Sequence, residues 1–348
     1  MTLDNIISPD KVQAVKQAVD SHSRFVIVCH MTPDGDALGS SLCLWHMLTA
    51  MGKSAFVVTP DMPSHNLMFL PGSDKIVVAS CHTARAASLL SKTDVIFCLD
   101  FNDFMRVDRM KPMLESSQAK KIMIDHHLNP IADVDLLISR PEEPSTCSLL
   151  YTLAHSAGWT DSWLDKDGAT CCYTGMMTDT GNFSYNSNHP HLYTIIAQLV
   201  TKGVDKDAIY NRVMNTNTLQ RLRIMGYAEY AKMDILQQHR CALITLSRKE
   251  LDEFSYTKGD TESLVNVPLS IPGVVYSIYL REDEPDFVKV SMRSRGEFSV
   301  KDICEAHFGG GGHHNAAGGE IHASLQEATS QVLAILPQYD HLLPQQPE

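Results

Sequence analysis

Histidines and aspartates follow three short apolar runs of this sequence. They are His30, Asp34 and Asp36 after residues 25–29, Asp100 after residues 95–99, and Asp125, His126 and His127 after residues 122–124. A further carboxylate, Asp179, stands at the C-terminal end of a predicted helix. Carboxylates with a minority of imidazoles and no thiolate suit Mn²⁺ or Mg²⁺ better than structural zinc. Since these groups outnumber what one ion needs, they predict a site for two divalent cations.

The three apolar runs are typical of buried β-strands, because they are short, rich in β-branched residues and followed by polar residues. Similar runs cover residues 55–58 and 136–138, and apolar residues at helical spacing over 38–48 predict a helix that Gly52 stops. Strands that alternate with helices favour an α/β fold with a parallel sheet and helices on its faces. The ligand site of such a sheet lies outside the carboxyl ends of its strands. Ionisable side chains gathered there would repel one another or stay desolvated without a cation between them.

The rest of the chain predicts a second, smaller α/β domain. Residues 145–157 and 169–177 predict helices, and the mostly polar stretch 187–220 predicts helical turns and a connector. A long helix is expected from about Leu222, followed by strands over 241–246, 274–280 and 287–292, a glycine-rich turn, and a helix over 325–336. With 348 residues the chain is too long for one ordinary core. We expect domains over residues 1–214 and 219–342, with a cleft between them.

The composition indicates a globular protein. Hydrophobic residues make up 44% of the chain and charged residues 20%, which argues against disorder. No apolar run approaches the roughly 18 residues that span a bilayer, and the N-terminus does not resemble a signal peptide. The nine cysteines are odd in number and form no C-x-x-C pair, so they fit thiols in a reducing compartment. We therefore expect a cytoplasmic protein without a membrane partner.

The formal net charge of −12 bears on the size of the ligand. Phosphate contacts dominate the affinity for long nucleic acid, and proteins that bind it usually carry a basic surface. This chain as a whole would repel a long polyanion. A small anionic ligand remains possible if metals or a few local arginines neutralise it.

Three motifs give the sequence a family resemblance. His30-Met31-Thr32-Pro33-Asp34-Gly35-Asp36 resembles the first motif of the DHH phosphoesterases, and Asp125-His126-His127 is the motif that names them. Residues 308–318, with four consecutive glycines before His313, resemble the signature of the DHH-associated C-terminal domain. The resemblance covers nearly the whole chain and is closest to the NrnA-type oligoribonucleases, which also act on phosphoadenosine phosphate (pAp).

The resemblance implies roles for the ionisable residues. One cation would take His30, Asp34 and Asp100, and the other would take Asp36, Asp100, His126 and Asp179. Asp100 would bridge the pair, and His127 would contact the phosphate or the attacking water. Asp36, Asp100 and His127 are thus the expected catalytic residues. Two-metal sites of this kind clamp an in-line displacement at phosphorus.

The resemblance also implies substrate contacts. They would come from Arg293, from Gly310, Gly311 and Gly312, and from His313 in the second domain. Without the family pattern, the glycine run could equally be a mobile tip or a tight turn. Arg106 either reaches the substrate or is an ordinary surface arginine, and Ser145-Thr146 is better explained as a helix cap than as a substrate contact.

The expected function is hydrolysis of short oligoribonucleotides to mononucleotides and of pAp to AMP, with two Mn²⁺ or possibly Mg²⁺. A phosphodiesterase for cyclic di-AMP or its linear product pApA shares the same motifs and stays open. A non-catalytic nucleotide sensor, a pyrophosphatase and a long-tract exonuclease are further alternatives. A homodimer is possible, and the motifs do not decide it.

Overall fold

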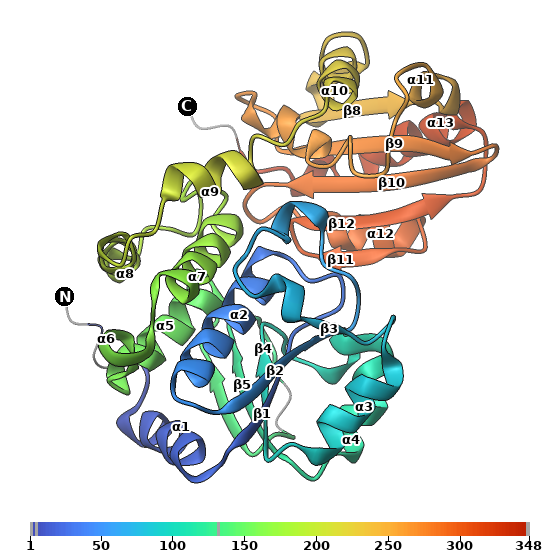
Figure 1. Cartoon of the computed structure of the whole chain (residues 1–348). Coiled ribbons are helices and arrows are strands. Elements are labelled where there is room, and N and C mark those ends of the chain that lie inside the picture. The colour runs from blue at the N-terminus through green and yellow to red at the C-terminus, as the bar shows by residue number, and fades with distance from the viewer. Residues whose placement is uncertain (1–2, 4–5, 131–132, 346–348) are drawn as a thin grey trace. The chain divides into compact units, whose positions relative to one another are not determined.

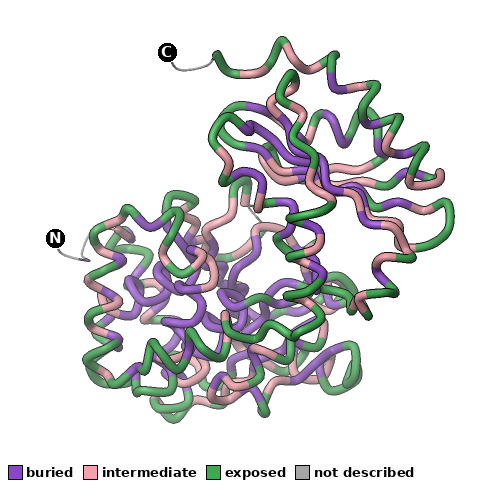
Figure 2. Tube along the Cα trace, turned by 90° about the horizontal axis from the view of Figure 1, so that it is seen from above, coloured by how far each residue is buried: buried purple, intermediate pink, exposed green. Residues whose placement is uncertain are grey.

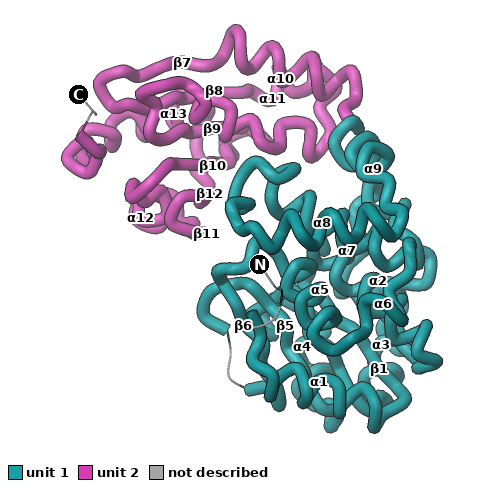
Figure 3. Tube along the Cα trace, turned by 90° about the vertical axis from the view of Figure 1, so that its left-hand side faces the viewer, with its two compact units in different colours: residues 1–216 teal, residues 217–348 magenta. Residues whose placement is uncertain are grey.

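The computed structural model describes residues 3, 6–130 and 133–345. It divides into two compact units, residues 1–216 and residues 217–348 (Figure 3). None of the helices in this described part of the chain is long and apolar enough to cross a membrane.

Unit 1 is built around a parallel sheet of six strands with the order β3-β2-β1-β4-β5-β6. The strands are β1 (Arg24–Val28), β2 (Ser54–Thr59), β3 (Val77–Val78), β4 (Val95–Leu99), β5 (Lys120–Asp125) and β6 (Leu136–Ser139). The α-helices are α1 (Pro9–Ser21), α2 (Gly35–Ala50), α3 (Thr83–Lys92), α4 (Lys111–Ser116), α5 (Thr146–Ser156), α6 (Trp159–Trp163), α7 (Lys166–Asp179), α8 (Pro190–Thr201) and α9 (Lys206–Val213). Short 3₁₀ helices are η1 (His65–Leu67), η2 (Ser73–Lys75) and η3 (Phe104–Met110).

Alternate residues of the central strands pack into two separate hydrophobic cores, one on each face of the sheet. Phe25 and Ile27 of β1 belong to the core that α1, α2, α5 and α7 cover, whereas Val26 and Val28 belong to the core under α3 and α4 (Figure 1). Because helices cover both faces of the sheet, its central strands carry continuous apolar runs instead of alternating apolar and polar residues. The predicted α/β class and parallel sheet are therefore confirmed, and β1, β4 and β5 are neighbours.

Unit 2 is a mixed sheet of six strands with the order β11-β12-β10-β9-β8-β7, in which only β8 and β9 pair in parallel. The strands are β7 (Met233–Leu236), β8 (Cys241–Leu246), β9 (Tyr276–Glu284), β10 (Phe287–Ser294), β11 (Gly311–His313) and β12 (Ala316–Ile321). The α-helices are α10 (Leu219–Ala231), α11 (Arg248–Glu253), α12 (Val300–His307) and α13 (Leu325–Ile335). Short 3₁₀ helices are η4 (Gln237–His239), η5 (Leu264–Ser270), η6 (Leu336–Gln338) and η7 (Asp340–Leu342).

The core of unit 2 also lies on both faces of its sheet. Helices α12 and α13 cover one face, with Ile303 and Val332 buried there, and α10 and α11 cover the other, with Ile224 and Leu251. Figure 2 shows buried positions in the interior of each unit and exposed positions along its outer segments.

Two sequence predictions need correction. The stretch 187–220 forms two regular helices, α8 and α9, where we predicted only helical turns. The glycine run does not form a simple turn, because Gly311 to His313 pair with β12 as an edge strand. Tight packing of the backbone against β12 explains the second difference: a Cβ atom at Gly310 would lie 1.9 Å from the carbonyl oxygen of Gly318.

Candidate metal centre

The candidate centre lies at the carboxyl ends of β1, β4 and β5. His30 follows β1, Asp100 follows β4 directly, and His126 follows β5. Asp100 adopts a left-handed backbone conformation with a φ of 65°, which non-glycine residues rarely do. Its N–H donates to the carbonyl oxygen of Ile124 in the neighbouring strand (3.2 Å). This strained turn holds the Asp100 carboxylate over the end of the sheet, where it is buried.

Helix α2 positions the two carboxylates of the first motif differently. Asp34 is its N-cap, and its Oδ1 accepts hydrogen bonds from the N–H groups of Asp36 and Ala37. The second oxygen, Oδ2, stays free of the cap and lies 3.7 Å from Nε2 of His30. Asp36 lies in the first turn and is 1% exposed.

The N-terminus of α5 binds the Asp36 carboxylate. Backbone N–H groups of Thr146 and Cys147 donate to Oδ2 and Oδ1 of Asp36 at 2.6 and 2.9 Å. A helix N-terminus favours a negative charge, because its first N–H groups lack partners within the helix. Ser145 caps this helix as predicted, and the hydroxyl of Thr146 also donates to Oδ1 of Asp100 (2.9 Å).

Close packing of α2 on α7 brings Asp179 to the same place. A Cβ atom at Gly175 would lie 2.3 Å from Sγ of Cys147 and 2.9 Å from Oδ1 of Asp36. Glycine at this position therefore lets α7 approach the Asp36 turn. Asp179 stands one turn later, at the C-terminal end of α7. A negative charge is unfavourable at the C-terminal end of a helix, so the Asp179 carboxylate does not stabilise α7.

The structure brings all six predicted metal ligands together. Their donor atoms form the groups His30, Asp34 and Asp100, then Asp36, His126 and Asp179, and finally Asp100, His126 and His127, each within 4.8 Å. Nε2 of His126 lies 3.3 Å from Asp179, 3.6 Å from Asp100 and 3.9 Å from Asp36. Asp100 belongs to the first and third groups and His126 to the second and third, so these two residues link the three groups.

A backbone carbonyl orients the imidazole of His30 and that of His126. Nδ1 of His30 lies 2.7 Å from the carbonyl oxygen of Met31, and Nδ1 of His126 lies 3.1 Å from that of Glu143. A carbonyl can only accept, so Nδ1 carries a proton in both rings. In the neutral imidazole this leaves a lone pair on Nε2, which faces the carboxylates. Metal-binding histidines are usually held in this way.

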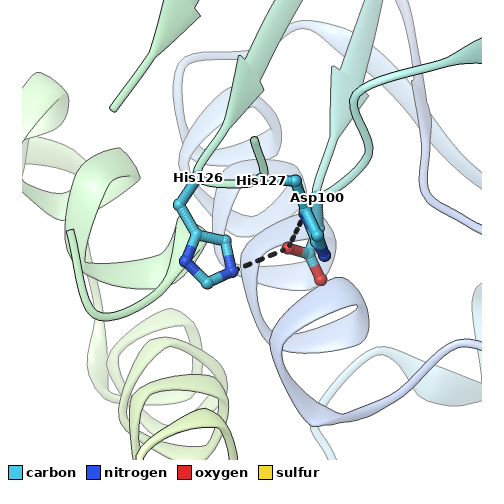
Figure 4. Close-up of side chains that lie close together, drawn as sticks. All are labelled: Asp100, His126 and His127. Carbon is cyan, nitrogen blue, oxygen red and sulfur yellow. Dashed lines mark ion pairs between the residues drawn. The ribbon is translucent and has the colours of Figure 1, made fainter. Parts of the chain in front are cut away.

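His127 differs from the other two histidines. Its Nδ1 lies 2.8 Å from Oδ1 of the buried Asp125 and 3.8 Å from Oδ1 of Asp100. Figure 4 shows His126 and His127 flanking the Asp100 carboxylate. Because Asp125 occupies the Nδ1 of His127, the other ring nitrogen is left for a further partner.

The carboxylates of the cluster repel one another. Burial, together with repulsion from Asp100 and Asp179, raises the pKa of Asp36 well above its usual value. Burial also raises the pKa of Asp179 to about 6, with attraction to His126 opposing the shift and repulsion from Asp100 adding to it. Ionising these groups together is therefore costly unless a positive charge accompanies them.

His30 supplies part of that positive charge. Burial opposes protonation of His30, but its contacts with Asp100 and Asp34 outweigh burial and raise its pKa to about 10. Burial likewise disfavours the charged form of Asp100, but the contacts with His30 and the two histidines after β5 hold its pKa well below the usual value. The cluster therefore attracts cations.

The donor set fits divalent cations. Nε2 of His30 is buried and has no hydrogen-bond partner, its nearest oxygens being Oδ2 of Asp100 at 3.4 Å and Oδ2 of Asp34 at 3.7 Å. A buried nitrogen left without a partner costs free energy, and coordination of a cation would remove that cost. Four carboxylates and two imidazoles without thiolate match Mn²⁺ or Mg²⁺.

The predicted substrate residues lie in both units. Arg106 is in η3, and its carbonyl oxygen accepts the N–H of Met31 (2.7 Å), which ties the Asp100 loop to the His30 loop. Arg293 is half-buried on β10, where its guanidinium donates to the carbonyl oxygen of Met292 (2.9 Å). Their contacts with a substrate remain predictions.

Gly311, Gly312 and His313 form strand β11, which makes a hairpin with β12. Gly310 and Gly312 must lack side chains because a Cβ would strike the backbone of β12, whereas Gly311 faces open space, with its nearest neighbour Glu305 at 3.7 Å. His313 is exposed. Of the three predicted glycines, therefore, only Gly311 has no packing reason of its own.

Sequence reasoning missed three residues that support the cluster. The first is Glu143, which is buried and whose carbonyl oxygen accepts a hydrogen bond from Nδ1 of His126. The second is His191, whose Nε2 lies 2.9 Å from the Glu143 carboxylate. The third is Thr146, which we read only as part of a cap. No spacing in the sequence marks these residues, because their partners are 17, 48 and 46 positions away.

Comparison with known proteins agrees with the motifs. The sequence matches the DHH family, N-terminal domain, over residues 24–176 and the DHHA1 domain over residues 242–338. It is 30% identical over 310 residues to the bifunctional oligoribonuclease and PAP phosphatase NrnA of Thermus thermophilus, covering 88% of this chain and 87% of that protein. It is 25% identical to the cyclic-di-AMP phosphodiesterase GdpP of Bacillus subtilis, covering 94% of this chain and 49% of that protein.

Solved structures share the fold. An exopolyphosphatase-related protein from Bacteroides fragilis has a TM-score of 0.92 at 41% identity, covering 98% of this chain and 99% of that one. RecJ of Thermus thermophilus in complex with Mn²⁺ has a TM-score of 0.54 at 14% identity, covering 98% of this chain and 57% of that one. The second likeness concerns the fold alone. The chain belongs to the DHH family of phosphoesterases, with a DHHA1 domain following its DHH domain.

Proposed function

We propose that this enzyme hydrolyses short oligoribonucleotides to mononucleotides and converts pAp to AMP and phosphate. The main support for the proposal is the cluster of six donor side chains, whose groups Asp100 and His126 link. The substrates follow from the similarity to the oligoribonuclease and PAP phosphatase of Thermus thermophilus.

In this proposal the cluster holds two divalent cations, Mn²⁺ or Mg²⁺. His30, Asp34 and Asp100 would hold one, and Asp36, Asp100, His126 and Asp179 the other. Bound there, the cations would offset the negative charge of the phosphate and lower the pKa of a water molecule. The donor chemistry and the unpartnered Nε2 of His30 support this assignment.

The remaining residues of the site orient these groups and the phosphate. The N–H groups at the start of α5 fix the Asp36 carboxylate, and the Thr146 hydroxyl fixes that of Asp100. Asp125 holds the Nδ1 of His127, so Nε2 of His127 can contact a phosphate oxygen or exchange a proton with the leaving group. We place Asp36, Asp100 and His127 in the reaction on these grounds.

Exposed apolar side chains beside the cluster support a nucleotide substrate. Met31 follows His30 and is 43% exposed, Leu128 follows His127 and is 70% exposed, and Tyr185 is 59% exposed. The ring of Tyr185 lies over Gly181, two residues after Asp179, where a Cβ atom would be 2.1 Å from it. Exposed apolar groups near a polar site often mark a ligand surface, and an aromatic ring offers a stacking face to a base.

Arg293, the glycine hairpin, His313 and Arg106 are proposed substrate contacts. Arginine forms forked hydrogen bonds to phosphate, and burial lowers the pKa of Arg293 without reaching a range in which a guanidinium loses its proton. The net charge of −12 favours a small anion over a long strand. We therefore expect a free-ended, short substrate.

The test compares the release of mononucleotides from a labelled diribonucleotide, a long strand of equal concentration and pAp, each with Mn²⁺. We expect fast turnover of the diribonucleotide and pAp and slow turnover of the long strand. Equal rates on the short and long substrates would refute the proposed preference. Asp100→Asn is the inactive control, since it removes the carboxylate shared by the groups.

A phosphodiesterase for cyclic di-AMP or pApA is the second candidate. The similarity to GdpP over 94% of this chain favours it. Assaying AMP release from pAp, pApA and cyclic di-AMP side by side separates the two proposals. Faster hydrolysis of cyclic di-AMP than of pAp would replace the first proposal with the second. A non-catalytic nucleotide sensor would bind these compounds without turnover.

A further inference from the structure

A largely buried side-chain pair, Glu143 and His191, lies next to His126, outside the groups assigned to cations. The carboxylate of Glu143 accepts a hydrogen bond from Nε2 of His191 (2.9 Å). The hydroxyl of Ser148 lies 3.4 Å from this carboxylate and donates to the carbonyl oxygen of Ser145 (2.7 Å). Glu143 is 3% exposed and the side chain of His191 13% exposed. Burying a carboxylate costs free energy even when it is paired, so packing alone does not explain a glutamate here.

The backbone of Glu143 connects this pair to the cluster. Its carbonyl oxygen accepts the Nδ1 proton of His126 (3.1 Å), and its N–H donates to the carbonyl oxygen of Arg140 (2.9 Å). The N–H of Arg140 in turn donates to the carbonyl oxygen of Asp125 (3.0 Å). The turn from Arg140 to Glu143 therefore folds back on the strand end that carries His126, and the carbonyl of Glu143 sets the orientation of its ring.

His191 comes from a distant part of the chain and has no role in its own helix. It stands in the first turn of α8, directly after Pro190. Positive charge is unfavourable at a helix N-terminus, so a histidine there does not help α8 itself. Its contact with Glu143, 48 positions earlier, fastens the start of α8 to the turn behind His126.

We propose that Glu143 and His191 are a pair of positioning residues that fix the His126 imidazole for cation binding. The inference rests on the proposed function, because it takes His126 as a ligand. His191 holds the Glu143 side chain, and the Glu143 carbonyl keeps the proton of His126 on Nδ1 with its Nε2 lone pair facing Asp36, Asp100 and Asp179. Partners of this kind commonly change metal affinity 10- to 100-fold when they are lost.

The test uses His191→Phe in the full chain. Phenylalanine keeps a ring of similar size and removes the donor, and His191→Gln restores a donor. His82→Phe is the matched control, because His82 is exposed, directly precedes α3 and makes no side-chain cap bond to that helix. A second variant, Glu143→Met, keeps the backbone carbonyl and a similar side-chain volume but removes the carboxylate that accepts from His191, and Glu115→Met at an exposed position of α4 is its control.

Two readouts are needed. Calorimetric titration with Mn²⁺ should show that His191→Phe weakens one of two binding steps about tenfold and leaves the other unchanged, while His191→Gln recovers most of the loss. Nitrogen NMR of the His126 ring in metal-free protein should show a single tautomer in the wild type and an exchanging ring in His191→Phe. In the diribonucleotide assay kcat should fall with little change in KM.

Unchanged Mn²⁺ affinity and an unchanged His126 tautomer in both His191→Phe and Glu143→Met would overturn the inference, even if the melting temperature fell. If the wild type bound no Mn²⁺ but His126 lost its fixed tautomer in the variants, the pair would be confirmed as positioning residues and the proposed function would fail instead. If His191→Phe does not fold, Glu143→Met decides the question with the same two readouts.

Discussion

The cluster should destabilise the protein when no cation is bound, and Asp179→Asn tests this directly. Asparagine has nearly the same shape as aspartate and carries no charge. The pKa of Asp179 is raised from 3.8 to about 6, a shift of roughly 2 units. At about 1.36 kcal/mol per unit, keeping Asp179 ionised costs the folded state at most about 3 kcal/mol. Its side chain is 28% exposed, so solvent screening reduces this to roughly 1–2 kcal/mol.

The sign of the pH dependence follows from the direction of the shift. An acid whose pKa is higher in the folded than in the unfolded protein binds its proton more tightly when folded. Asp179 therefore imposes no penalty below pH 4, an increasing one between about pH 4 and pH 6, and the full penalty above pH 6. Asp179→Asn removes that penalty, so the variant should be more stable than the wild type at pH 7.5 and equally stable at pH 4.

The assay is thermal unfolding with chelator present, at both pH values. Unit 1 has 216 residues, and for a domain of this size 1 kcal/mol corresponds to roughly 2–4 °C. We expect the metal-free variant to melt on the order of 5 °C higher at pH 7.5, while the exposed Asp207→Asn control shifts little. Added Mn²⁺ should raise the melting temperature of the wild type more than that of the variant. A metal-free variant that melts at or below the wild type at pH 7.5 would refute the reasoning.

Four further substitutions test separate parts of the account. Thr146→Val removes the hydroxyl bond to the Asp100 carboxylate and should lower kcat roughly 10-fold or more. Thr152→Val, which loses only a hydroxyl bond within α5, should leave kcat unchanged, and equal kcat values for the two variants would contradict this role of Thr146. Gly310→Ala should destabilise unit 2, because its Cβ would meet the backbone of β12. Gly311→Ala should keep the melting temperature and lower activity if the hairpin approaches the substrate; full activity would remove Gly311 from the site. Tyr185→Ala should raise KM for a diribonucleotide about 5- to 100-fold through lost stacking and leave Mn²⁺ affinity unchanged, and an unchanged KM would argue against a base contact.

Local sequence patterns predicted the parts of the fold that short-range physics determines. Strands β1, β4 and β5 were predicted because short β-branched runs buried on both faces leave a clear apolar signal. The order of the strands follows from long-range pairing that no local pattern contains. The glycine run was misread as a turn, because four glycines permit many conformations and only their contact with β12 selects a strand.

The residue types of the cluster could be predicted from the sequence, but the residues that orient them could not. Histidines and aspartates at strand ends stand out, and Asp179 stands out at the C-terminal end of a predicted helix. Glu143 and His191 carry no such mark, because a glutamate in a Pro-Glu-Glu-Pro turn and a histidine after a proline look like surface residues. Only the folded chain shows that the two are buried together behind His126.

The central claim is that six side chains from distant segments hold two divalent cations. Titration of the metal-free protein with Mn²⁺, followed by electron paramagnetic resonance, tests it most directly, with His30→Ala and Asp179→Asn as variants of the two groups. We predict two bound ions per chain with a spin-coupled signal, and one weakened step in each variant. A single uncoupled ion, or unchanged binding in both variants, would contradict the account.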